Sequence, residues 1–407
     1  MRILMISDVY FPRINGVSTS IKSFRDELIA QGHEVILIAP EYPADNKIQY
    51  VDDINIMRIK SQQVILDPED RFMSKKHILN RLHYLKYKQF DVLHIHTPFV
   101  AHYAGLKLAK ALNIPCVESY HTYFEEYLYQ YIPFLPKSWL KGLARKVSRS
   151  QCNSVDAVVV PSNAMQEALN GYGVICEKSI IPTGLNINDF KPGNAAEFRR
   201  EYDIPETQPL LVHIGRVAHE KNIDFLLLML DLLRYSVPDI LLVITGEGPS
   251  LSHLKARVKK LKLEKHVRFI GYLSREKELM ACYKAGDVFV FSSHTETQGL
   301  VLLEAMACGT PVVSLAKMGT VDILKPEKGA IISDDDPQDF AVKVSLVLLN
   351  TTMRERMSQE AKEYAATWST QKMTNKMLTF YQRTVLSHVN KSTLSNKGCV
   401  EINQEAS

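Results

Sequence analysis

Two glutamates eight positions apart carry the strongest chemical signal in this sequence. Glu296 lies in a polar stretch just after the apolar run 288–291, and Glu304 lies inside a helix that Gln298 and Gly299 would open. The first N–H groups of a helix have no intrahelical partner, so they favour an anionic ligand. A carboxylate in the first turns can hold ribose hydroxyls, and one in the preceding loop can hold sugar hydroxyls. The pair therefore indicates a nucleotide-sugar site.

A second segment has side chains that suit the phosphates of such a ligand. Gly215–Asn222 follows the apolar run 210–214 and contains Arg216 and Lys221. The guanidinium fork of arginine matches phosphate oxygens, and lysine adds a point charge. We interpret this segment as the diphosphate side of the site, with a solvated charged loop as the alternative.

Two further strand ends can add backbone to the site. Gly246 begins a tight turn after the strand candidate 241–245. This turn is either purely structural or part of the wall of the ligand crevice. Tyr272 and Leu273 follow the strand candidate 267–270, and their backbone can pair with the edge of a nucleobase.

The N-terminal half offers a glycine loop and a histidine. Asn15 and Gly16 follow the first strand candidate, with Ser18 as the expected cap of the next helix. A glycine here lets the backbone approach a pyrophosphate, but the loop lacks the GxGxxG pattern, so nicotinamide dinucleotide binding is not supported. His121 comes just after a strand ending at Glu118, where it can bond a sugar hydroxyl or polarise a reacting centre. A structural histidine is the alternative.

Two groups of residues have the chemistry of metal ligands but are interpreted otherwise. His94 and His96 occupy alternate positions of a strand without a third ligand at metal spacing, so packing and hydrogen bonding are expected. The aspartate run 334–336 is interpreted as a polar turn before a helix that starts at Pro337. We therefore predict a diphosphate site without a metal, where the helix dipole, arginine and lysine replace Mg²⁺. No cofactor is expected.

The elements that must position these residues alternate regularly. Apolar runs followed by helical patterns predict parallel sheets wrapped by helices, with ligands at the carboxyl ends of the strands. The expected strands are 3–6, 35–39, 92–95, 116–118, 157–160, 210–214, 241–245, 267–270, 288–291, 312–314 and 330–332. The expected helices are 17–31, 102–112, 139–150, 225–235, 251–262, 276–285, 300–307, 337–349 and 353–386.

The predicted fold class is α/β, with two doubly wound Rossmann-like domains facing each other across a crevice. Residues 181–192 break the alternation with Pro, Gly and Asn, and we take them as the linker. The expected divisions are an N-terminal acceptor- and membrane-facing domain over 1–185, a nucleotide-sugar-binding domain over 186–365, a helix over 366–387 and a disordered tail over 388–407.

Length and composition narrow the function classes. The chain of 407 residues exceeds one typical core, and its 46% hydrophobic content is ordinary for a globular protein. A net charge of +4 is too small to argue for nucleic acid as a partner. The six cysteines have no paired spacing, and the sequence has no apolar run of about 18 residues. No signal peptide is expected. A reduced, cytoplasmic protein with at most peripheral membrane contact is expected.

One basic segment suggests such a contact. Lysine or arginine recurs every four residues from 137 to 149 with tryptophan and leucine between, and aromatic residues crowd the preceding stretch 127–135. Residues 71–90 form a second basic stretch, in which no acidic residue occurs. Basic amphipathic helices of this kind lie in membrane interfaces, whereas a helix packed on its own domain is the alternative. The expected membrane-binding residues are Lys137, Trp139, Lys141, Arg145, Lys146 and Arg149.

Several motifs together resemble those of a known family. Gly215–Lys221, Thr295–Gly299 and Leu303–Val312 are similar to the motifs of the retaining glycosyltransferases of family four, which have the GT-B fold. The resemblance extends over nearly the whole chain. Further segments resemble more closely the bacterial α-glucosyltransferases that act on diacylglycerol. These segments are Tyr120–Leu128, Ser148–Asn153 and Val160–Ser162.

The resemblance implies a role for each matching position. The catalytic residues would be His121, beside the anomeric carbon, and Glu296, on the hydroxyls of the donor sugar. Glu304 would hold the ribose, and the last helix would cross back to the N-terminal domain. The other expected donor contacts are Asn15, Gly16, Arg216, Lys221, Gly246, Tyr272, Leu273, Gln298, Gly299 and Leu300.

The resulting hypothesis is transfer of a hexose, glucose in the first instance, from a UDP-sugar to a membrane lipid. The expected acceptor is 1,2-diacylglycerol and the product an α-glycolipid, made by a cytoplasmic protein bound peripherally to the anionic inner face of the cell membrane. Another acceptor, such as a lipopolysaccharide-type glycan, and a non-catalytic nucleotide-sugar-binding protein are the alternatives. The sequence leaves the hexose, the nucleobase and the oligomeric state open.

Overall fold

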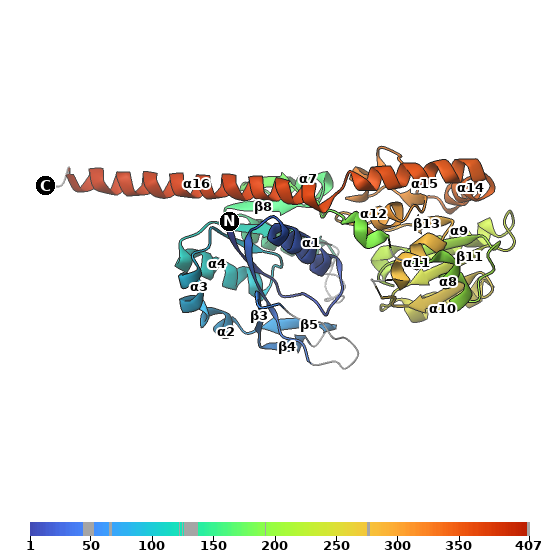
Figure 1. Cartoon of the computed structure of the whole chain (residues 1–407), viewed down its shortest axis with the longest axis horizontal. Coiled ribbons are helices and arrows are strands. Elements are labelled where there is room, and N and C mark those ends of the chain that lie inside the picture. The colour runs from blue at the N-terminus through green and yellow to red at the C-terminus, as the bar shows by residue number, and fades with distance from the viewer. Residues whose placement is uncertain are drawn as a thin grey trace. The chain divides into compact units, whose positions relative to one another are not determined.

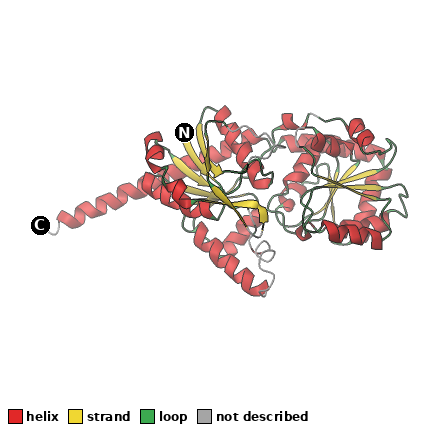
Figure 2. Ribbon diagram, turned by 90° about the horizontal axis from the view of Figure 1, so that it is seen from below, coloured by secondary structure: helices red, strands yellow, loops and turns green. Residues whose placement is uncertain are grey.

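The alternation of apolar strands and helices folds into two parallel sheets, each in its own unit (Figure 1). The computed structural model describes residues 1–43, 53–64, 67–121, 123, 125, 137–191, 193–274 and 277–404, and at 64, 67–70, 137 and 392–404 it describes the backbone alone. Unit 1 comprises Met1–Gly184 and Thr370–Ser407, and unit 2 comprises Leu185–Ser369. In each unit helices cover both faces of the sheet, which confirms the predicted fold class (Figure 2).

The sheet of unit 1 has seven parallel strands in the order β3-β2-β1-β6-β7-β8-β9. The strand order reverses between β1 and β6. These neighbouring parallel strands form a switch point, because the chain connections that follow them cross the sheet toward opposite edges. The strands are β1 (Arg2–Ile6), β2 (Glu34–Pro40), β3 (Ile56–Ile59), β6 (Val92–Ile95), β7 (Cys116–Ser119), β8 (Ala157–Val160) and β9 (Glu177–Ile180), with an antiparallel hairpin of β4 (Ser61–Val64) and β5 (Asp67–Met73).

The helices of unit 1 include one that returns from the C-terminal end of the chain. This helix, α16, packs beside α1 (Figure 1). The helices are α1 (Gly16–Ala30), α2 (Lys75–Leu79), α3 (Leu82–Lys88), α4 (Val100–Leu112), α6 (Lys137–Cys152), α7 (Asn163–Gly171) and α16 (Thr370–Gln404).

The sheet of unit 2 has six parallel strands in the order β12-β11-β10-β13-β14-β15, and its order reverses between β10 and β13. The strands are β10 (Leu210–Ile214), β11 (Leu241–Thr245), β12 (Val267–Gly271), β13 (Val288–Phe291), β14 (Val312–Leu315) and β15 (Ala330–Ser333). The α-helices are α8 (Ala195–Glu201), α9 (Ile223–Leu233), α10 (Leu251–Lys260), α11 (Glu278–Ala285), α12 (Leu300–Ala307), α13 (Thr320–Leu324), α14 (Pro337–Leu349) and α15 (Thr351–Ala366), and short 3₁₀ turns cover Ile187–Phe190 and His219–Lys221.

Both faces of the unit 2 sheet are apolar because helices cover both of them. Successive side chains of a strand point to opposite faces, so Leu210 and Val212 join one core cluster while Leu211 joins the other. Burial on both sides explains why these strands appear in the sequence as continuous apolar runs.

The C-terminal region differs from expectation in two places. The helical pattern expected over 353–386 is interrupted after α15, where Trp368 accepts a hydrogen bond from the backbone N–H of Leu185 at 2.8 Å and Ser369 forms a bridge with the same residue. The tail predicted to be disordered over 388–407 is instead helical as far as Gln404. Because this stretch lacks proline, adding residues to a helix already anchored on unit 1 costs far less than starting a new one.

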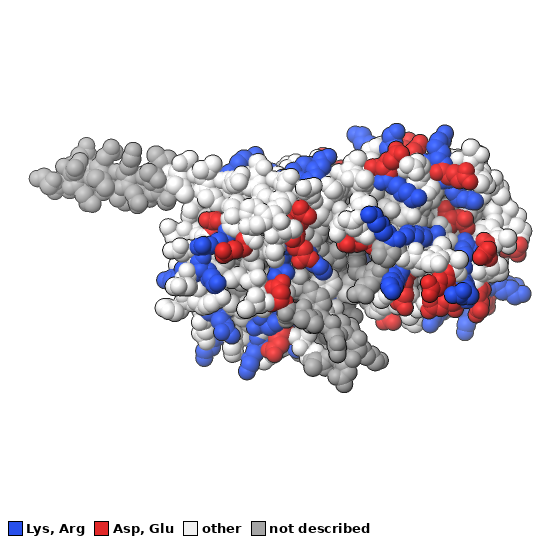
Figure 3. Space-filling model, in the orientation of Figure 1, with Lys and Arg blue, Asp and Glu red and all other residues white. Residues whose placement is uncertain are grey.

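The surface carries charges of both signs. On the face shown in Figure 3, Lys and Arg side chains lie among Asp and Glu side chains on each unit. None of the described helices combines the length and the apolar character that crossing a membrane requires.

Candidate functional site

The two charged motifs of unit 2 meet at the switch point of its sheet. β10 and β13 are paired neighbours, with Val212 opposite Phe289, so the loops after them lie side by side. Across these loops Lys221 Nζ donates a hydrogen bond to Glu296 Oε1. The two side chains expose only 21% and 16% of their surface. The structure therefore joins two residues that the sequence predicted separately, and it places them where ligands bind in doubly wound sheets.

The loop after β10 rests directly on the loop after β11. The backbone N–H of Val217 donates to the carbonyl of Glu247 at 2.9 Å, and the N–H of Gly246 donates to the carbonyl of Gly271 at 2.7 Å. Gly246 has a φ of 123°, and a Cβ there would lie 2.0 Å from the carbonyl oxygen of Gly215. A side chain at this position would therefore force the two loops apart.

We expect Gly246→Ala to weaken nucleotide binding at least about tenfold. The new methyl group must displace the Gly215 carbonyl, and the positive φ costs about 1–3 kcal/mol for a residue with a Cβ. Isothermal titration with UDP measures the affinity, and urea unfolding measures the stability. Gly171→Ala is the matched control, since a Cβ at Gly171 meets no heavy atom of the described residues within 4 Å. Equal affinity of Gly246→Ala and the native protein would contradict the assignment of this loop.

The loop that carries Glu296 is supported from the neighbouring strand end. The N–H of Gly319 donates to the carbonyl of Glu296 at 2.8 Å. A Cβ at Gly319 would lie 2.0 Å from the carbonyl oxygen of Thr297, so the two backbones are in direct contact. The loop after β14 thus fixes the position of the Glu296 backbone.

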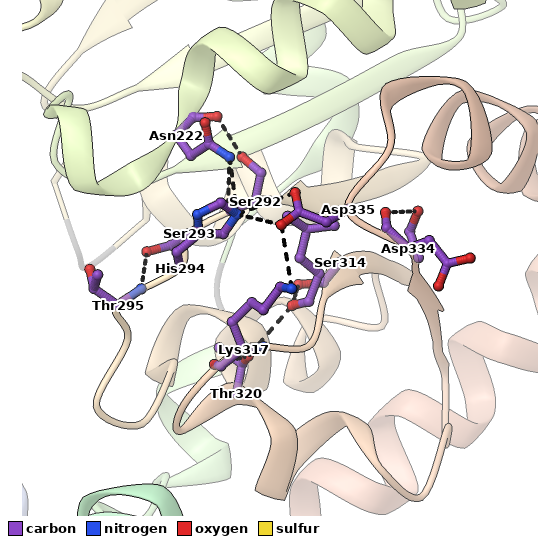
Figure 4. Close-up of polar contacts among 12 residues, drawn as sticks. Asn222, Ser292, Ser293, His294, Thr295, Ser314, Lys317, Thr320, Asp334 and Asp335 are labelled. Carbon is purple, nitrogen blue, oxygen red and sulfur yellow. Dashed lines mark hydrogen bonds and ion pairs between the residues drawn. The ribbon is translucent and has the colours of Figure 1, made fainter. Parts of the chain in front are cut away.

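A polar network beside this loop links the ends of β13 and β15 with the start of α9 (Figure 4). His294 Nε2 lies 3.4 Å from Asn222 Nδ2 and 3.2 Å from Asp335 Oδ2, and Lys317 Nζ lies 3.3 Å from the same carboxylate oxygen. Sequence reasoning missed this network because its members come from four separate segments. The predicted turn at 334–336 is confirmed, since Asp336 caps α14 by accepting from the N–H of Asp339 at 2.9 Å.

The predicted helix start at Gly299 is confirmed. Gly299 has a φ of 91° and precedes α12 as its cap, while Gln298 is buried and Leu300 packs on the core. Glu304 is buried one turn further on, and its Oε2 accepts a hydrogen bond from the hydroxyl of Tyr283 at 2.9 Å. Tyr283 was not predicted, although a tyrosine in the otherwise apolar stretch of α11 is the kind of residue that serves such a carboxylate.

The remaining predicted donor contacts of unit 2 lie on the same edge of the sheet. Arg216 follows β10 and is exposed. Tyr272 and Leu273 follow β12, and the first is 61% exposed whereas the second packs against the core. Within the described part of the chain, no group of three or more His, Cys, Asp or Glu side chains is arranged to hold a metal ion.

In unit 1 the loop after β1 leads into α1, but the cap differs from the prediction. The prediction of Ser18 as cap is wrong, because the helix begins at Gly16 and the side chain of Asn15 accepts a hydrogen bond from the N–H of Ser18 at 2.8 Å. Asparagine in an extended conformation is as good a cap as serine, and it comes first in the chain. Open space surrounds the Cα of Gly16, since a Cβ there would meet no described heavy atom within 4 Å.

His121 belongs to a stack of three histidines in unit 1. The rings of His94 and His96 lie 4.0 Å apart, and His96 Nδ1 lies 3.4 Å from His121 Nε2. His94 is hydrogen-bonded on both sides, to the hydroxyl of Tyr381 on α16 at 2.6 Å and to Ser119 Oγ at 2.8 Å, which confirms packing and hydrogen bonding for this residue. Burial lowers the pKa of His94 to about 3 and that of His121 to about 4, so both rings are neutral near pH 7.

The basic helix α6 presents an apolar stripe outward. Trp139, Leu143 and Val147 recur every four residues and are 75%, 48% and 36% exposed. On one flank Arg145 Nε donates to Glu125 Oε1 of the same unit at 2.6 Å.

The other expected membrane-binding residues of α6 differ in their surroundings. Lys146 and Arg149 are exposed, Arg149 lies against Gly173, and Lys141 is half-buried. The side chain of Lys137, the aromatic stretch 127–135 and three residues beside His121 lie outside the described residues. These three are Thr122, Phe124 and Glu126.

Comparison with known proteins covers both units. The family model described as Glycosyltransferase Family 4 matches residues 14–189, and the model described as Glycosyl transferases group 1 matches residues 194–364. The alpha-monoglucosyldiacylglycerol synthase of Streptococcus pneumoniae is 32% identical over 321 residues, which cover 77% of this chain and 71% of that protein.

More distant similarities extend over nearly the whole chain. A GDP-mannose-dependent alpha-mannosyltransferase of Mycobacterium tuberculosis is 27% identical over 338 residues, which cover 82% of this chain and 83% of that one. The crystal structure of Anabaena HepE in complex with UDP-glucose has the same fold, with a TM-score of 0.71 at 17% identity over 94% of this chain and 100% of the other. The chain therefore belongs to glycosyltransferase family 4 and is a glycosyltransferase with the GT-B fold of two Rossmann-like domains.

Proposed function

We propose that this glycosyltransferase moves glucose from UDP-glucose to 1,2-diacylglycerol at an anionic membrane surface, with retention of the α configuration. The observation that carries the proposal is the Lys221–Glu296 pair at the switch point of unit 2, beside the start of α12. The lysine offers a cation to a pyrophosphate, and the glutamate offers an acceptor to the hydroxyls of a sugar ring. The similarity to an alpha-monoglucosyldiacylglycerol synthase supports the choice of glucose as the transferred sugar and of diacylglycerol as the acceptor.

The donor side of the reaction is assigned to unit 2. Negative charge develops on the leaving phosphate, so fixed cations and N–H groups at that position lower the barrier. Lys221 and Arg216 supply the cations, and the first N–H groups of α12 point to the same edge of the sheet. Glu304 holds the ribose hydroxyls, and the Tyr283 hydroxyl keeps its carboxylate in one orientation.

The acceptor side is assigned to unit 1. His121 is neutral near pH 7 because burial lowers its pKa to about 4. Its uncharged ring can therefore accept a hydrogen bond from a hydroxyl or donate one to it. We assign His121 to the transferring hexose, and Asn15 and Gly16 to the phosphates from the start of α1.

The membrane-facing surface is assigned to α6 and the start of α4. The exposed stripe on α6 consists of Trp139, Leu143 and Val147. One turn further along the helix, the buried Gln151 donates through Nε2 to the carbonyl of Pro98 at 2.7 Å, which joins α6 to the start of α4. Beside Pro98, the cap and the first turn of α4 expose further aromatic surface. These residues are Phe99, which is 43% exposed, and Tyr103, which is 51% exposed. An exposed apolar strip with basic neighbours has the composition of an interfacial surface.

A donor panel tests the assignment of the nucleotide sugar. We expect UDP-glucose to bind at least about tenfold more tightly than GDP-mannose, a difference of about 1.4 kcal/mol. Isothermal titration with the intact nucleotide sugars and with UDP and GDP separates the contributions of sugar and base. Tighter binding of GDP-mannose would favour the second candidate, a mannosyltransferase, for which the similarity to a GDP-mannose-dependent enzyme is the specific observation.

A further inference from the structure

The last helix of the chain reaches the histidine stack of unit 1 through one tyrosine. Tyr381 lies on α16 and is fully buried. Its hydroxyl is 2.6 Å from Nδ1 of His94, and the two rings make an edge contact with their centroids 5.5 Å apart. The chain leaves unit 1 after Gly184 and returns to it at Thr370, so a helix that follows unit 2 contacts a residue 287 positions earlier in the sequence.

This connection runs along one face of the unit 1 sheet. Successive side chains of a strand point to opposite faces, so His94 and His96 share a face. β6 and β7 are paired with His94 opposite Val117, which places Ser119 on that face as well. The 2.8 Å contact between His94 Nε2 and Ser119 Oγ agrees with this register. The face is therefore the one on which Tyr381 packs.

From His94 the connection leads to His121 by two routes. The first is through the rings, because His96 lies 4.0 Å from His94 and its Nδ1 lies 3.4 Å from Nε2 of His121. The rings of His96 and His121 are nearly parallel, at 15° with their centroids 5.7 Å apart. The second route is through the backbone, because Ser119, which contacts His94, comes two residues before His121. The orientation of the His94 ring therefore affects both the stack and the strand end that carry His121.

The chemistry of the contact between Tyr381 and His94 indicates orientation more than stability. Both side chains are fully buried. Two apolar side chains of the same shape would fill this space without withdrawing a hydroxyl and an imidazole from water. A satisfied buried polar contact adds a single defined arrangement of its members. Burial raises the pKa of Tyr381 and lowers that of His94 to about 3, so both groups are uncharged near pH 7.

We propose that Tyr381 is a positioning residue for His121. Its hydroxyl fixes the ring of His94, which holds the side chains beside His121 in place. The inference rests on the proposed function in one respect, which is that His121 contacts the transferring hexose. The packing of α16 on unit 1 thus completes the acceptor side of the site, and the last helix contributes to the reaction as well as to the core of unit 1.

Tyr381→Phe tests this role because it removes the hydroxyl and keeps the ring. Nδ1 of His94 then loses this partner in a buried environment, and the ring can turn. We expect kcat to fall about tenfold while the KM for UDP-glucose stays within about twofold, since a displaced catalytic group slows the reacting complex whereas unit 2 binds the donor.

A spectrum of the full chain labelled with ¹³C-histidine measures the displacement itself. The ring resonance of His121 is identified by its loss in His121→Gln. Because the ring of His96 is stacked on that of His121, a turn of the stack changes the magnetic surroundings of His121. We expect the resonance to shift by more than its linewidth in Tyr381→Phe.

Thr384→Val is the matched control. Thr384 lies on the same helix and is 2% exposed, and its hydroxyl donates to the carbonyl of Phe380 at 2.9 Å. The variant removes a buried hydroxyl from α16 and leaves the hydrogen bonds of His94 intact, so kcat and the His121 resonance should stay unchanged. Equal losses of kcat in Thr384→Val and Tyr381→Phe, or an unshifted His121 resonance in Tyr381→Phe, would overturn the inference.

A second background separates positioning from a general loss of stability. If Tyr381 acts through His121, Tyr381→Phe should not lower the remaining activity of His121→Ala, since residues that act as one unit are not additive. A further tenfold loss in that background would contradict the inference. If Tyr381→Phe does not fold, Ser119→Ala decides, because it removes the hydroxyl at the other nitrogen of His94. An unchanged His121 resonance in Ser119→Ala would overturn the inference.

The two measurements also distinguish this inference from the proposed function, because the spectra require no turnover. A native protein that transfers no glucose to diacylglycerol, with the His121 resonance shifted in Tyr381→Phe, would refute the proposed function alone. Equal transfer rates of the native protein and Tyr381→Phe would refute the inference and leave the proposed function intact.

Discussion

Replacing Lys221 with methionine is expected to lower kcat at least about a hundredfold while unit 2 stays folded. Removal of a single fixed donor from a site of developing negative charge costs about 10²–10³ in rate. Lys221 is the cation that the structure holds next to Glu296, with only 21% of its side chain exposed, so little water is available to replace it. Steady-state kinetics with UDP-glucose measure the rate, and circular dichroism measures the fold.

The matched control for Lys221→Met is Lys343→Met. Lys343 Nζ lies 2.7 Å from Asp339 in the same unit, and its side chain is 27% exposed, so the substitution also breaks a half-buried lysine–carboxylate pair. We expect it to leave kcat unchanged. An equal loss of rate in both variants would mean that Lys221 acts only through the stability of unit 2.

Glu296→Gln should lower kcat by a similar factor, and the double variant should lose little more than either single variant. Residues that act as one unit are not additive, because the first substitution already disables the arrangement. Additive losses in the double variant would indicate that the ion pair is structural and that the two residues act independently.

Replacing Leu143 with glutamate is expected to abolish most of the binding to vesicles that contain anionic lipid, with at least about a tenfold loss of affinity. Burial of a large apolar side chain contributes about 1.5–3 kcal/mol, and each cation near an anionic surface contributes about 1 kcal/mol. A glutamate in the middle of the stripe removes the first contribution and opposes the second. Sedimentation with vesicles measures the effect.

Leu346→Glu provides the matched control for this test. Leu346 lies on α14 of unit 2 and is 50% exposed, close to the 48% of Leu143. Equal losses in the two variants would show that any exposed leucine contributes and would contradict a membrane surface on α6. Charge reversal of Arg145 is a poorer test, because it would place a second carboxylate beside Glu125, which pairs with Arg145.

The sequence predicted all six strands of the unit 2 sheet but missed both edge strands of the unit 1 sheet. Strands such as β10 and β13 are continuous apolar runs because helices bury both of their faces, and their bounds were predicted to the residue. β9 was missed because Glu177–Ile180 is a half-exposed edge strand with polar residues, and its pattern differs little from that of a loop. β3 was missed for a similar reason, being a short strand at the opposite edge of the sheet.

The site was predicted as separate motifs and not as contacts. Lys221 and Glu296 meet because β10 and β13 are neighbours, and the order of strands in a sheet is a tertiary property that local patterns do not contain. The same reason explains why the hydrogen bond from Tyr283 to Glu304 and the ion pair of His294 with Asp335 were missed. None of these residues belongs to a recognisable pattern within its own segment of the sequence.

The most direct test of the proposed function is transfer of radiolabelled glucose from UDP-glucose to diacylglycerol in mixed vesicles with and without an anionic lipid. We expect label in the organic phase, stimulation by the anionic lipid and loss of the product with Lys221→Met. Proton NMR of the product should show an α-anomeric linkage. Release of free glucose without any labelled lipid, or a labelled lipid formed from GDP-mannose but not from UDP-glucose, would contradict the proposed function.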